Sequence, residues 1–349
     1  MKDKAAVINE TEPTAQPLSS GKVESGSESW SASRLERGVS VIIPVYNSAT
    51  ILPELVPRLL DVLEKIGVGF EVLLVDDGSR DRSWDVIKEF AQAHSAIRGV
   101  NLMRNYGQHH ALLRGIKVAR YDVIVTMDDD MQNPPEEIPI LLTKLAEGYD
   151  VVYGTPAQKD HSLWRELAAK ASKLALRSAM GAAARQASAF RAFRTELRRA
   201  FASYNSPYVV IDVLLTWGTT HFAAVVVRCD RRRSGTSGYS FTKLVAQSIN
   251  LLTGFSVLPL RVASLIGFGC AFFGGVLLLY VVVRFLLQGS IPGFPFLASA
   301  ISLFSGAQLL ALGIIGEYLA RLHFRSMGRP YSVVRATTGF DADVREEHL

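Results

Sequence analysis

Three consecutive aspartates, Asp128 to Asp130, follow an apolar run and give the strongest chemical signal in the sequence. Like charges this close repel one another, and a bound cation relieves the repulsion. Oxygen ligands without histidine or cysteine suit Mg²⁺ or Mn²⁺ better than zinc. We therefore predict that this acidic run binds a divalent ion that bridges two phosphates. The alternative is a solvated acidic turn before Pro134 and Pro135.

Ligand-binding residue types also end the other apolar runs of the N-terminal half. These runs are predicted strands, and an open parallel sheet binds ligands beyond the carboxyl ends of its strands. The residues at these ends are Pro44, Asn47, Asp76, Asp77 and Arg104. A single acid such as Asp81 or Asp85 is explained equally well as a helix cap or turn former. Four strand ends that carry such residues predict one shared binding site.

Glycine loops that cradle phosphates are missing from these strand ends. Neither GxxxxGK[ST] nor GxGxxG follows a predicted strand. The P-loop and dinucleotide-binding interpretations therefore lose their main support.

Short apolar runs alternate with helical stretches from Val39 to about Gly154. This pattern predicts βαβ units with right-handed crossovers and a parallel sheet buried on both faces, an α/β fold of Rossmann-like type. The predicted strands are Ser40 to Tyr46, Glu71 to Asp77, Val100 to Arg104, Asp122 to Asp130 and Asp150 to Gly154. Leu52 to Ile66 and His109 to Ala119 are predicted helices.

A second region, about Gln158 to Cys229, is predicted to contain two helices around Phe190 to Arg194. It is predicted to end in a strand, His221 to Cys229, that completes the sheet, and to close over the site.

The composition indicates that part of the chain lies in a membrane. The 349 residues are 48% hydrophobic, and the mean hydropathy of +0.18 is high for a purely soluble protein. The net charge of +5 comes from Arg and Lys clusters near apolar segments, which favours a membrane surface or an anionic phosphate over nucleic acid. Cys229 and Cys270 lie in separate regions, so neither a metal-type spacing nor a disulfide framework is present, and a reducing compartment is expected.

Two uncharged apolar segments, Val262 to Val283 and Phe294 to Gly316, are each long enough to cross a bilayer core of about 30 Å. The alternative is a pair of buried core helices. The connector Leu287 to Gly293 lacks Lys and Arg, whereas basic residues precede and follow the pair. The positive-inside rule therefore places both ends in the cytoplasm. Before the pair, Arg231 to Gly254 is predicted to form a basic loop and an amphipathic helix in the lipid interface.

Four motifs carry a family resemblance: SVIIPVYN, VLLVDDGSRD, NYGQHHALLRGI and VTMDDDMQNPPEEIP. In this order and spacing they resemble family-2 glycosyltransferases of GT-A fold, especially bacterial polyprenyl-phosphate glycosyltransferases related to dolichyl-phosphate mannose synthase. The resemblance covers about Val39 to Arg335. It implies inverting, metal-dependent transfer of a sugar, with UDP-hexose as the expected donor, to an undecaprenyl-type phosphate for cell-envelope glycans. It also implies a multi-pass protein of the cytoplasmic membrane, with its catalytic domain on the cytoplasmic side, that forms a homo-oligomer, a tetramer.

The resemblance also assigns roles to individual residues. Pro44, Tyr46, Asp76 and Asp77 hold the nucleoside, and Asn47 and Arg104 from the strand-end argument complete this nucleotide-sugar site. Asp128 and Asp130 match the acids of a DxD motif, with Asp130 as the direct metal ligand. Gln132 lies near the donor sugar. The segment RRSGTSGYS resembles an RxxGxSxYS loop, so Arg232, Ser237 and Tyr239 bind the pyrophosphate or the acceptor phosphate.

Three departures from the family pattern affect these roles. Ser48 stands where many members have Glu, Gly238 replaces a frequent Lys, and Gln186 to Ala189 lacks an acid proposed as base in some relatives. Asp212 is then the nearest acid for a general base, or it has a buried, helix-pairing role. An acceptor phosphate is largely dianionic at pH 7 and does not require a base.

The predicted divisions are a disordered tail (1–38), a GT-A domain (39–230), an acceptor loop with interfacial helix (231–258), a transmembrane hairpin (259–323) and a cytoplasmic tail (324–349). Two other functions stay open. A processive polysaccharide synthase would share the nucleotide half, but Trp30, Trp84, Trp164 and Trp217 do not fit its QxxRW pattern. A nonenzymatic lipid-carrier transporter or scaffold is the third possibility.

Overall fold

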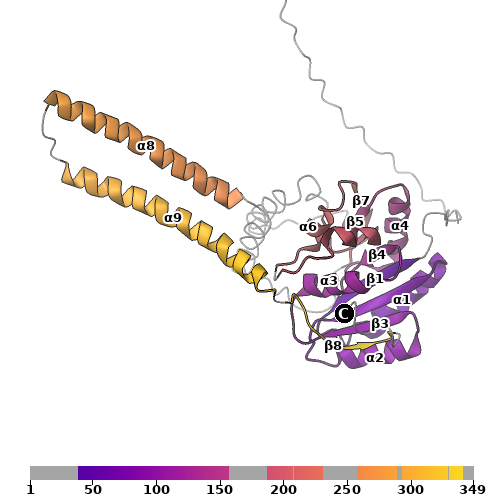
Figure 1. Ribbon diagram of the computed structural model, residues 1–349. Coiled ribbons are helices and arrows are strands. Elements are labelled where there is room, and N and C mark those ends of the chain that lie inside the picture. Colours follow the sequence, from indigo (N-terminus) through magenta and orange to yellow (C-terminus); the bar gives the residue numbers. More distant parts are fainter. Residues whose placement is uncertain are drawn as a thin grey trace, which may run out of the picture.

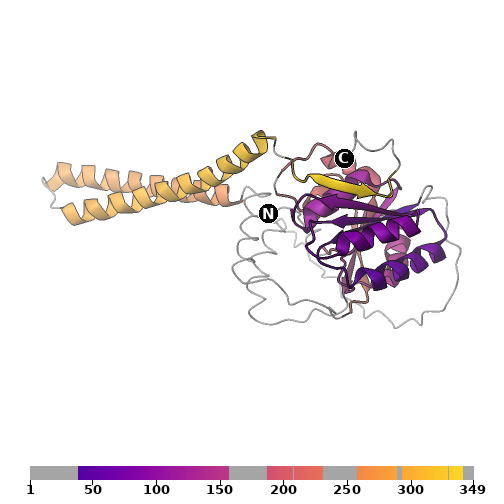
Figure 2. The same cartoon turned by 90° about the horizontal axis from the view of Figure 1, so that it is seen from below.

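The computed structural model describes residues 38–156, 187–206, 208–230, 258–288, 293–328 and 330–340. An α/β unit contains the sheet, and two long helices project from it side by side (Figures 1 and 2).

A mixed, mostly parallel sheet of eight strands forms the centre of the α/β unit. Its order is β7-β5-β6-β4-β1-β2-β3-β8. The strands that run in one direction are β1 (Val39–Val45), β2 (Phe70–Asp76), β3 (Ile97–Leu102), β4 (Val123–Thr126), β5 (Val151–Pro156) and β7 (Phe222–Val227). The strands β6 (Arg191–Arg194) and β8 (Val334–Thr338) are antiparallel to their neighbours. The predicted α/β fold with a mostly parallel sheet is therefore confirmed.

Helices cover both faces of the sheet, which is why its inner strands are buried on both sides and largely apolar. One face packs against α1 (Leu52–Ile66), α2 (Ser83–Ala93) and α4 (Ile138–Ala146). The opposite face packs against α3 (Gln108–Val118), the 3₁₀ helix η4 (Thr195–Phe201) and α6 (Ile211–Leu215). Helix α3 lies close to β1, because a Cβ at Gly115 would come within 2.4 Å of the Ile42 side chain.

Two strands are absent from the sequence-based prediction. Strand β6 lies at the centre of a stretch predicted to be flanked by helices, and it fills the space between β4 and β5 by pairing Arg191 with Thr126. Strand β8 lies within the predicted C-terminal tail and pairs with β3 at the edge of the sheet. Both are short and are formed by long-range pairing, which local periodicity does not reveal. The helix predicted after Gln158 lies outside the described residues.

The two projecting helices are α8 (Leu258–Gln288) and α9 (Phe294–Ser326). Within the described part of the chain, one helical stretch, Pro259–Leu287, is long and apolar enough to cross a membrane, with a mean hydropathy of 2.4. Its apolar side chains are exposed, for example Phe268 at 74% and Leu286 at 76%. Both helices extend beyond the uncharged segments found in the sequence. That both cross a membrane stays a prediction.

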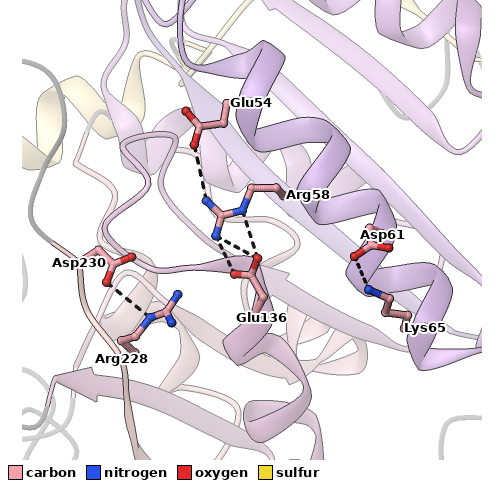
Figure 3. A network of polar contacts seen from close by, with 7 residues as sticks. All are labelled: Glu54, Arg58, Asp61, Lys65, Glu136, Arg228 and Asp230. Carbon is pink, nitrogen blue, oxygen red and sulfur yellow. Dashed lines mark hydrogen bonds and ion pairs between the residues drawn. The ribbon is translucent and has the colours of Figure 1, made fainter.

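An exposed ionic network connects α1 to the 3₁₀ helix η2 (Pro135–Glu137) (Figure 3). The Arg58 guanidinium Nη2 lies 2.9 Å from Glu136 Oε1, and Nη1 lies 3.8 Å from Glu54 Oε1. Exposed pairs of this kind contribute about 0–1 kcal/mol to stability. Arg58 is therefore a suitable control position for experiments on buried arginines.

Candidate active site

A pocket of about 510 Å³ opens at the carboxyl ends of β1, β2 and β4, where the first residues of α3 also lie. It is lined by Pro44, Val45, Tyr46, Asp77, Asn105, Gly107, Gln108, Asp128, Asp129 and Asp130. The structure thus brings together five of the site residues predicted from the sequence: Pro44, Tyr46, Asp77, Asp128 and Asp130. The predicted residues Asn47, Asp76, Arg104 and Gln132 do not line this pocket. The first three are next to lining residues in the chain, and Gln132 comes two residues after Asp130.

Asp77 fixes the loop that forms one wall of the pocket. Its carboxylate accepts hydrogen bonds from the backbone N–H groups of Tyr106, at 2.7 Å, and Gly107, at 2.8 Å. Gly107 has φ 99°, a conformation that favours glycine. Burial raises the pKa of Asp77 to about 6, while the two backbone hydrogen bonds act in the opposite direction. The loop and β2 are therefore held together by a carboxylate with little water around it.

The turn after β1 is fixed by Asn47, which has a left-handed backbone (φ 55°). Its N–H donates to Ser79 Oγ at 2.9 Å, and its side-chain oxygen accepts from the Arg80 N–H at 2.8 Å. Asp76 accepts from the Ser79 N–H at 3.1 Å. In this structure Asn47 and Asp76 therefore shape the loops after β1 and β2.

The three aspartates of the acidic run have different partners. Asp128 accepts a hydrogen bond from the Gln108 side chain. Asp129 accepts from the Tyr46 N–H at 3.2 Å and from the Ser48 hydroxyl at 2.5 Å, so it is attached to the turn after β1. Burial raises the pKa of Asp129. Ser48, a departure from the family pattern, therefore has a defined local role.

Asp130 is the most buried of the three aspartates. Its Oδ1 accepts from the Gln132 N–H at 3.1 Å, across Met131, whose φ of 61° turns the chain sharply. Gln132 in turn accepts at its main-chain oxygen from the Asp230 N–H, at 2.8 Å. The acidic run is thus held from β1, from α3 and from the chain after β7.

Asp212 forms an ion pair with Arg191 beside the end of β4. Arg191 is 1% exposed, Asp212 is 13% exposed, and Arg191 Nε donates to Thr126 Oγ1 at 3.0 Å. The neighbouring His109 lies at the start of α3, and burial lowers its pKa to about 4. Asp212 does not line the pocket.

Arg104 stacks on the Tyr106 ring, with its Cζ 4.5 Å from the ring centre, and its side chain is exposed. The predicted acceptor residues Arg232, Ser237 and Tyr239 lie outside the described residues, as does Gln186.

Comparison with known proteins decides the family. The model of the family described as "Glycosyl transferase family 2" matches residues 40–200. The undecaprenyl-phosphate 4-deoxy-4-formamido-L-arabinose transferase of Pseudomonas aeruginosa (strain LESB58) is 38% identical over 308 residues, 86% of this chain and 91% of the relative. The protein of the same name from Pectobacterium carotovorum subsp. carotovorum (strain PC1) is 37% identical over 320 residues, 89% of this chain and 98% of the relative. The chain belongs to glycosyl transferase family 2.

This glycosyltransferase also resembles solved structures at lower similarity. One is the glucosyl-3-phosphoglycerate synthase of Mycobacterium tuberculosis in complex with Mn²⁺, uridine diphosphate and glucosyl-3-phosphoglycerate. It is 22% identical, with a TM-score of 0.47 over 65% of this chain and 84% of the other.

The acidic run of the glycosyltransferase fits a divalent ion that is shared with a substrate. Within the described ranges, no group of three or more His, Cys, Asp or Glu side chains forms a metal site by itself. Mg²⁺ is commonly held by one or two carboxylates together with substrate phosphates and water. Asp128 and Asp130 line one pocket and supply carboxylate oxygens of this kind.

Five pocket residues of the glycosyltransferase were not predicted as site residues: Val45, Asp129, Asn105, Gly107 and Gln108. The last three belong to the NYGQHH motif, which follows β3 and continues into the first turn of α3. A Gly-containing polar segment at the start of a helix, beyond the carboxyl end of a strand, was a sufficient signal for a ligand-contacting loop.

Asp77 gives the glycosyltransferase a defined pH dependence of stability. Its pKa is about 6 in the folded chain and near 3.8 ordinarily, so its contribution is fully present below pH 4 and is lost as the pH rises through 6. Each pKa unit corresponds to roughly 1.4 kcal/mol. As the pH rises from 4 to 6, the free energy of unfolding of the wild type should therefore fall relative to that of Asp77→Asn.

The measurement is thermal unfolding of both proteins across this pH range. His109 acts in the opposite sense, because its stabilising contribution is present above pH 6.5 and is lost as the pH falls toward 4. His109 is present in both proteins, so its contribution cancels in the difference. Equal pH slopes for the two proteins would contradict the assignment.

Proposed function

We propose that this glycosyltransferase transfers a sugar from a nucleotide sugar to an undecaprenyl-type polyprenyl phosphate at the cytoplasmic face of the membrane. The observation that carries the proposal is the acidic pocket at the strand ends of this chain. Over 86% of its length the chain is 38% identical to a transferase named for undecaprenyl phosphate. The adjoining apolar helix α8 supports a lipid acceptor.

The pocket suggests how the donor binds. We assign Pro44, Tyr46 and Asp77 to the nucleoside, with Asn47, Asp76 and Arg104 supporting or flanking these contacts. Gln132 is assigned to the donor sugar. Arg232, Ser237 and Tyr239 remain assigned to the donor pyrophosphate or the acceptor phosphate.

Asp128 and Asp130 would hold Mg²⁺ or Mn²⁺ together with the donor diphosphate. When bound, such an ion neutralises charge that develops on the departing nucleoside diphosphate. Gln108 orients Asp128, and the sharp turn at Met131 orients Asp130. Both carboxylates are thus held by hydrogen bonds within the chain, and preorganised groups of this kind favour electrostatic stabilisation of the leaving group.

The acceptor phosphate serves as the nucleophile. Its second pKa is about 6, so it is largely dianionic at pH 7 and attacks the anomeric carbon as the bond to the diphosphate breaks. A single displacement of this kind inverts the anomeric centre. The contribution of the protein is alignment of the two reactants, and the ion pair of Asp212 with Arg191 supports a structural role for this acid rather than a role as base.

The donor sugar is best identified by screening. The relatives are named for 4-deoxy-4-formamido-L-arabinose, whereas the sequence led us to expect a UDP-hexose. Purified protein in vesicles should release nucleoside diphosphate from one of these donors much faster when a polyprenyl phosphate is added than by hydrolysis of the donor alone. Equal release with and without the lipid would contradict the proposed acceptor.

For membrane topology, we propose that α8 and α9 both cross the bilayer and that the two chain termini lie in the cytoplasm. With Cys229 and Cys270 replaced by serine, Ser290→Cys should react with an impermeant thiol reagent added outside intact cells, because the connector lacks positive charge. Ser20→Cys should stay unlabelled until the membrane is opened. Labelling of Ser20→Cys in intact cells would overturn this topology. Formation of a homo-oligomer, a tetramer, stays a prediction.

A further inference from the structure

After α9 the chain returns to the sheet of the α/β unit. We name residues 330–340 the return segment; it contains β8, which pairs antiparallel with β3 at the edge of the sheet. Figure 2 shows β8 against the sheet, with α9 leading toward it. The Met103 N–H donates to Val333 O at 2.9 Å, and Arg335 Nη2 donates to Met103 O at 2.8 Å. The return segment is therefore bound to β3, the strand whose following loop supplies Asn105 and Gly107 to the pocket.

Helix α3 holds the start of the return segment through Arg114. The Arg114 guanidinium donates from Nη2 to the Ser332 main-chain oxygen at 3.2 Å and from Nε to the Ser332 hydroxyl at 3.3 Å. The Tyr331 ring centre lies 5.0 Å from Arg114 Cζ and 4.5 Å from Lys117 Nζ. Arg114, Tyr331 and Ser332 are all buried. Charge-assisted hydrogen bonds and cation–π contacts are among the stronger polar contacts when shielded from water.

The same helix begins in the pocket. The residue before it, Gly107, donates its N–H to Asp77, and its first residue, Gln108, donates to Asp128. Helix α3 is thus one rigid element whose first turn contacts the predicted nucleotide and metal ligands and whose later turns hold Tyr331 and Ser332.

A second contact holds α9 itself. Arg321 Cζ lies 4.2 Å from the ring centre of Tyr208, and the Arg321 side chain is only 10% exposed. Tyr208 lies just before α6, which carries the Asp212 partner of Arg191. The chain is therefore attached to the α/β unit at two separate places, once near the end of α9 and once in the return segment.

We propose that Arg114, Tyr331 and Ser332 form a positioning joint that fixes the end of α9 relative to the donor pocket. The inference rests on the proposed function, because the joint matters only if the acceptor phosphate is presented from the membrane. Displacement of a reacting group by about 1 Å can lower a rate roughly a hundredfold. A fixed distance between α9 and α3 would keep the membrane-held phosphate in line with the donor sugar.

The test uses Arg114→Met, with Tyr331→Leu as a second variant that keeps an apolar side chain in the buried position. Arg58→Met is the matched control, because it makes the same change in the exposed network of α1 (Figure 3). Three quantities are measured on full-length protein in vesicles: UDP binding with Mn²⁺, hydrolysis of the donor by water, and transfer to undecaprenyl phosphate. The joint variants should lose about tenfold or more in kcat/KM for the lipid, with UDP binding and donor hydrolysis unchanged. Arg58→Met should match wild type in all three.

A disulfide across β3 and β8 provides a rescue. Asn101 and Ala336 are paired in the register, and the Asn101 side-chain oxygen has no hydrogen-bond partner among the described residues, so the site accepts Cys. Cα atoms of antiparallel partners lie about 4.5–5.5 Å apart, which suits a disulfide. In a chain with Cys229→Ser and Cys270→Ser, oxidised Asn101→Cys/Ala336→Cys should restore transfer to Arg114→Met, and reduction should remove the gain.

If the wild type transfers sugar to the lipid, the proposed function stands, and two results would then contradict the proposed joint. One is wild-type lipid kcat/KM in both Arg114→Met and Tyr331→Leu. The other is a loss of UDP binding in both variants equal to the loss of transfer, which would show general damage to the fold. Absence of lipid transfer by the wild type would instead remove the proposed function, and the joint with it.

Discussion

Asp130→Asn is expected to lower sugar transfer by about a hundredfold or more, the usual cost of removing one electrostatic contact at a reacting centre. The substitution keeps the shape of the side chain and removes a negative charge from the most buried position of the acidic run. We expect weaker binding of Mg²⁺ or Mn²⁺ and poorer stabilisation of the departing diphosphate. Transfer measured across a titration of each ion should show both effects.

Asp129→Asn is the matched control, because it deletes one charge from the same tripeptide. Asp129 accepts hydrogen bonds from the Tyr46 N–H and the Ser48 hydroxyl, and an asparagine oxygen can retain such contacts. We therefore expect a smaller loss of transfer and an ion dependence close to that of wild type. Equal losses in the two variants would assign the effect to general charge removal instead of a metal ligand.

Asp212→Ala is expected to cost about 3–5 kcal/mol of folding free energy, because it leaves the guanidinium of Arg191 buried without its carboxylate. Thermal unfolding measures this loss. Asp61→Ala is the control, since the ion pair of Asp61 with Lys65 is exposed and contributes at most about 1 kcal/mol.

A double variant separates a structural role of Asp212 from a role as base. Asp212→Leu combined with Arg191→Met replaces the buried pair by apolar side chains and should recover most of the lost stability. Recovered stability together with substantial transfer would exclude Asp212 as an obligatory proton acceptor. A stable Asp212→Ala protein whose transfer has a strongly altered pH profile would support the base and contradict our account.

The sequence was informative wherever local periodicity and strand ends carry the signal. Helix α1 has the predicted bounds, Leu52 to Ile66, because its apolar spacing is regular and Gly67 ends it with φ 75°. The acidic run and Asp77 meet in one pocket because the carboxyl ends of parallel strands share one edge of a sheet.

Pairings over long distances in the chain could not be predicted in this way. Arg114 and Ser332 lie 218 positions apart, and neither has a local pattern that points to the other. Strand β6 offers only four residues, Arg191–Arg194, whose pairing with β4 and β5 is a tertiary property. The turn residues Asn105 and Gly107 could have been predicted as pocket residues. They belong to a recognised motif, and only the residue at which the following helix begins had to be known.

The most direct test of the central claim is isolation of the product. Purified protein in vesicles that contain undecaprenyl phosphate is incubated with a UDP-sugar and Mg²⁺ or Mn²⁺, and the lipids are extracted for mass spectrometry. Our account predicts a lipid-linked sugar in an amount equal to the nucleoside diphosphate released, and almost none with Asp130→Asn or in excess chelator. Nucleotide release without a lipid-linked sugar, or full product formation in excess chelator, would contradict it.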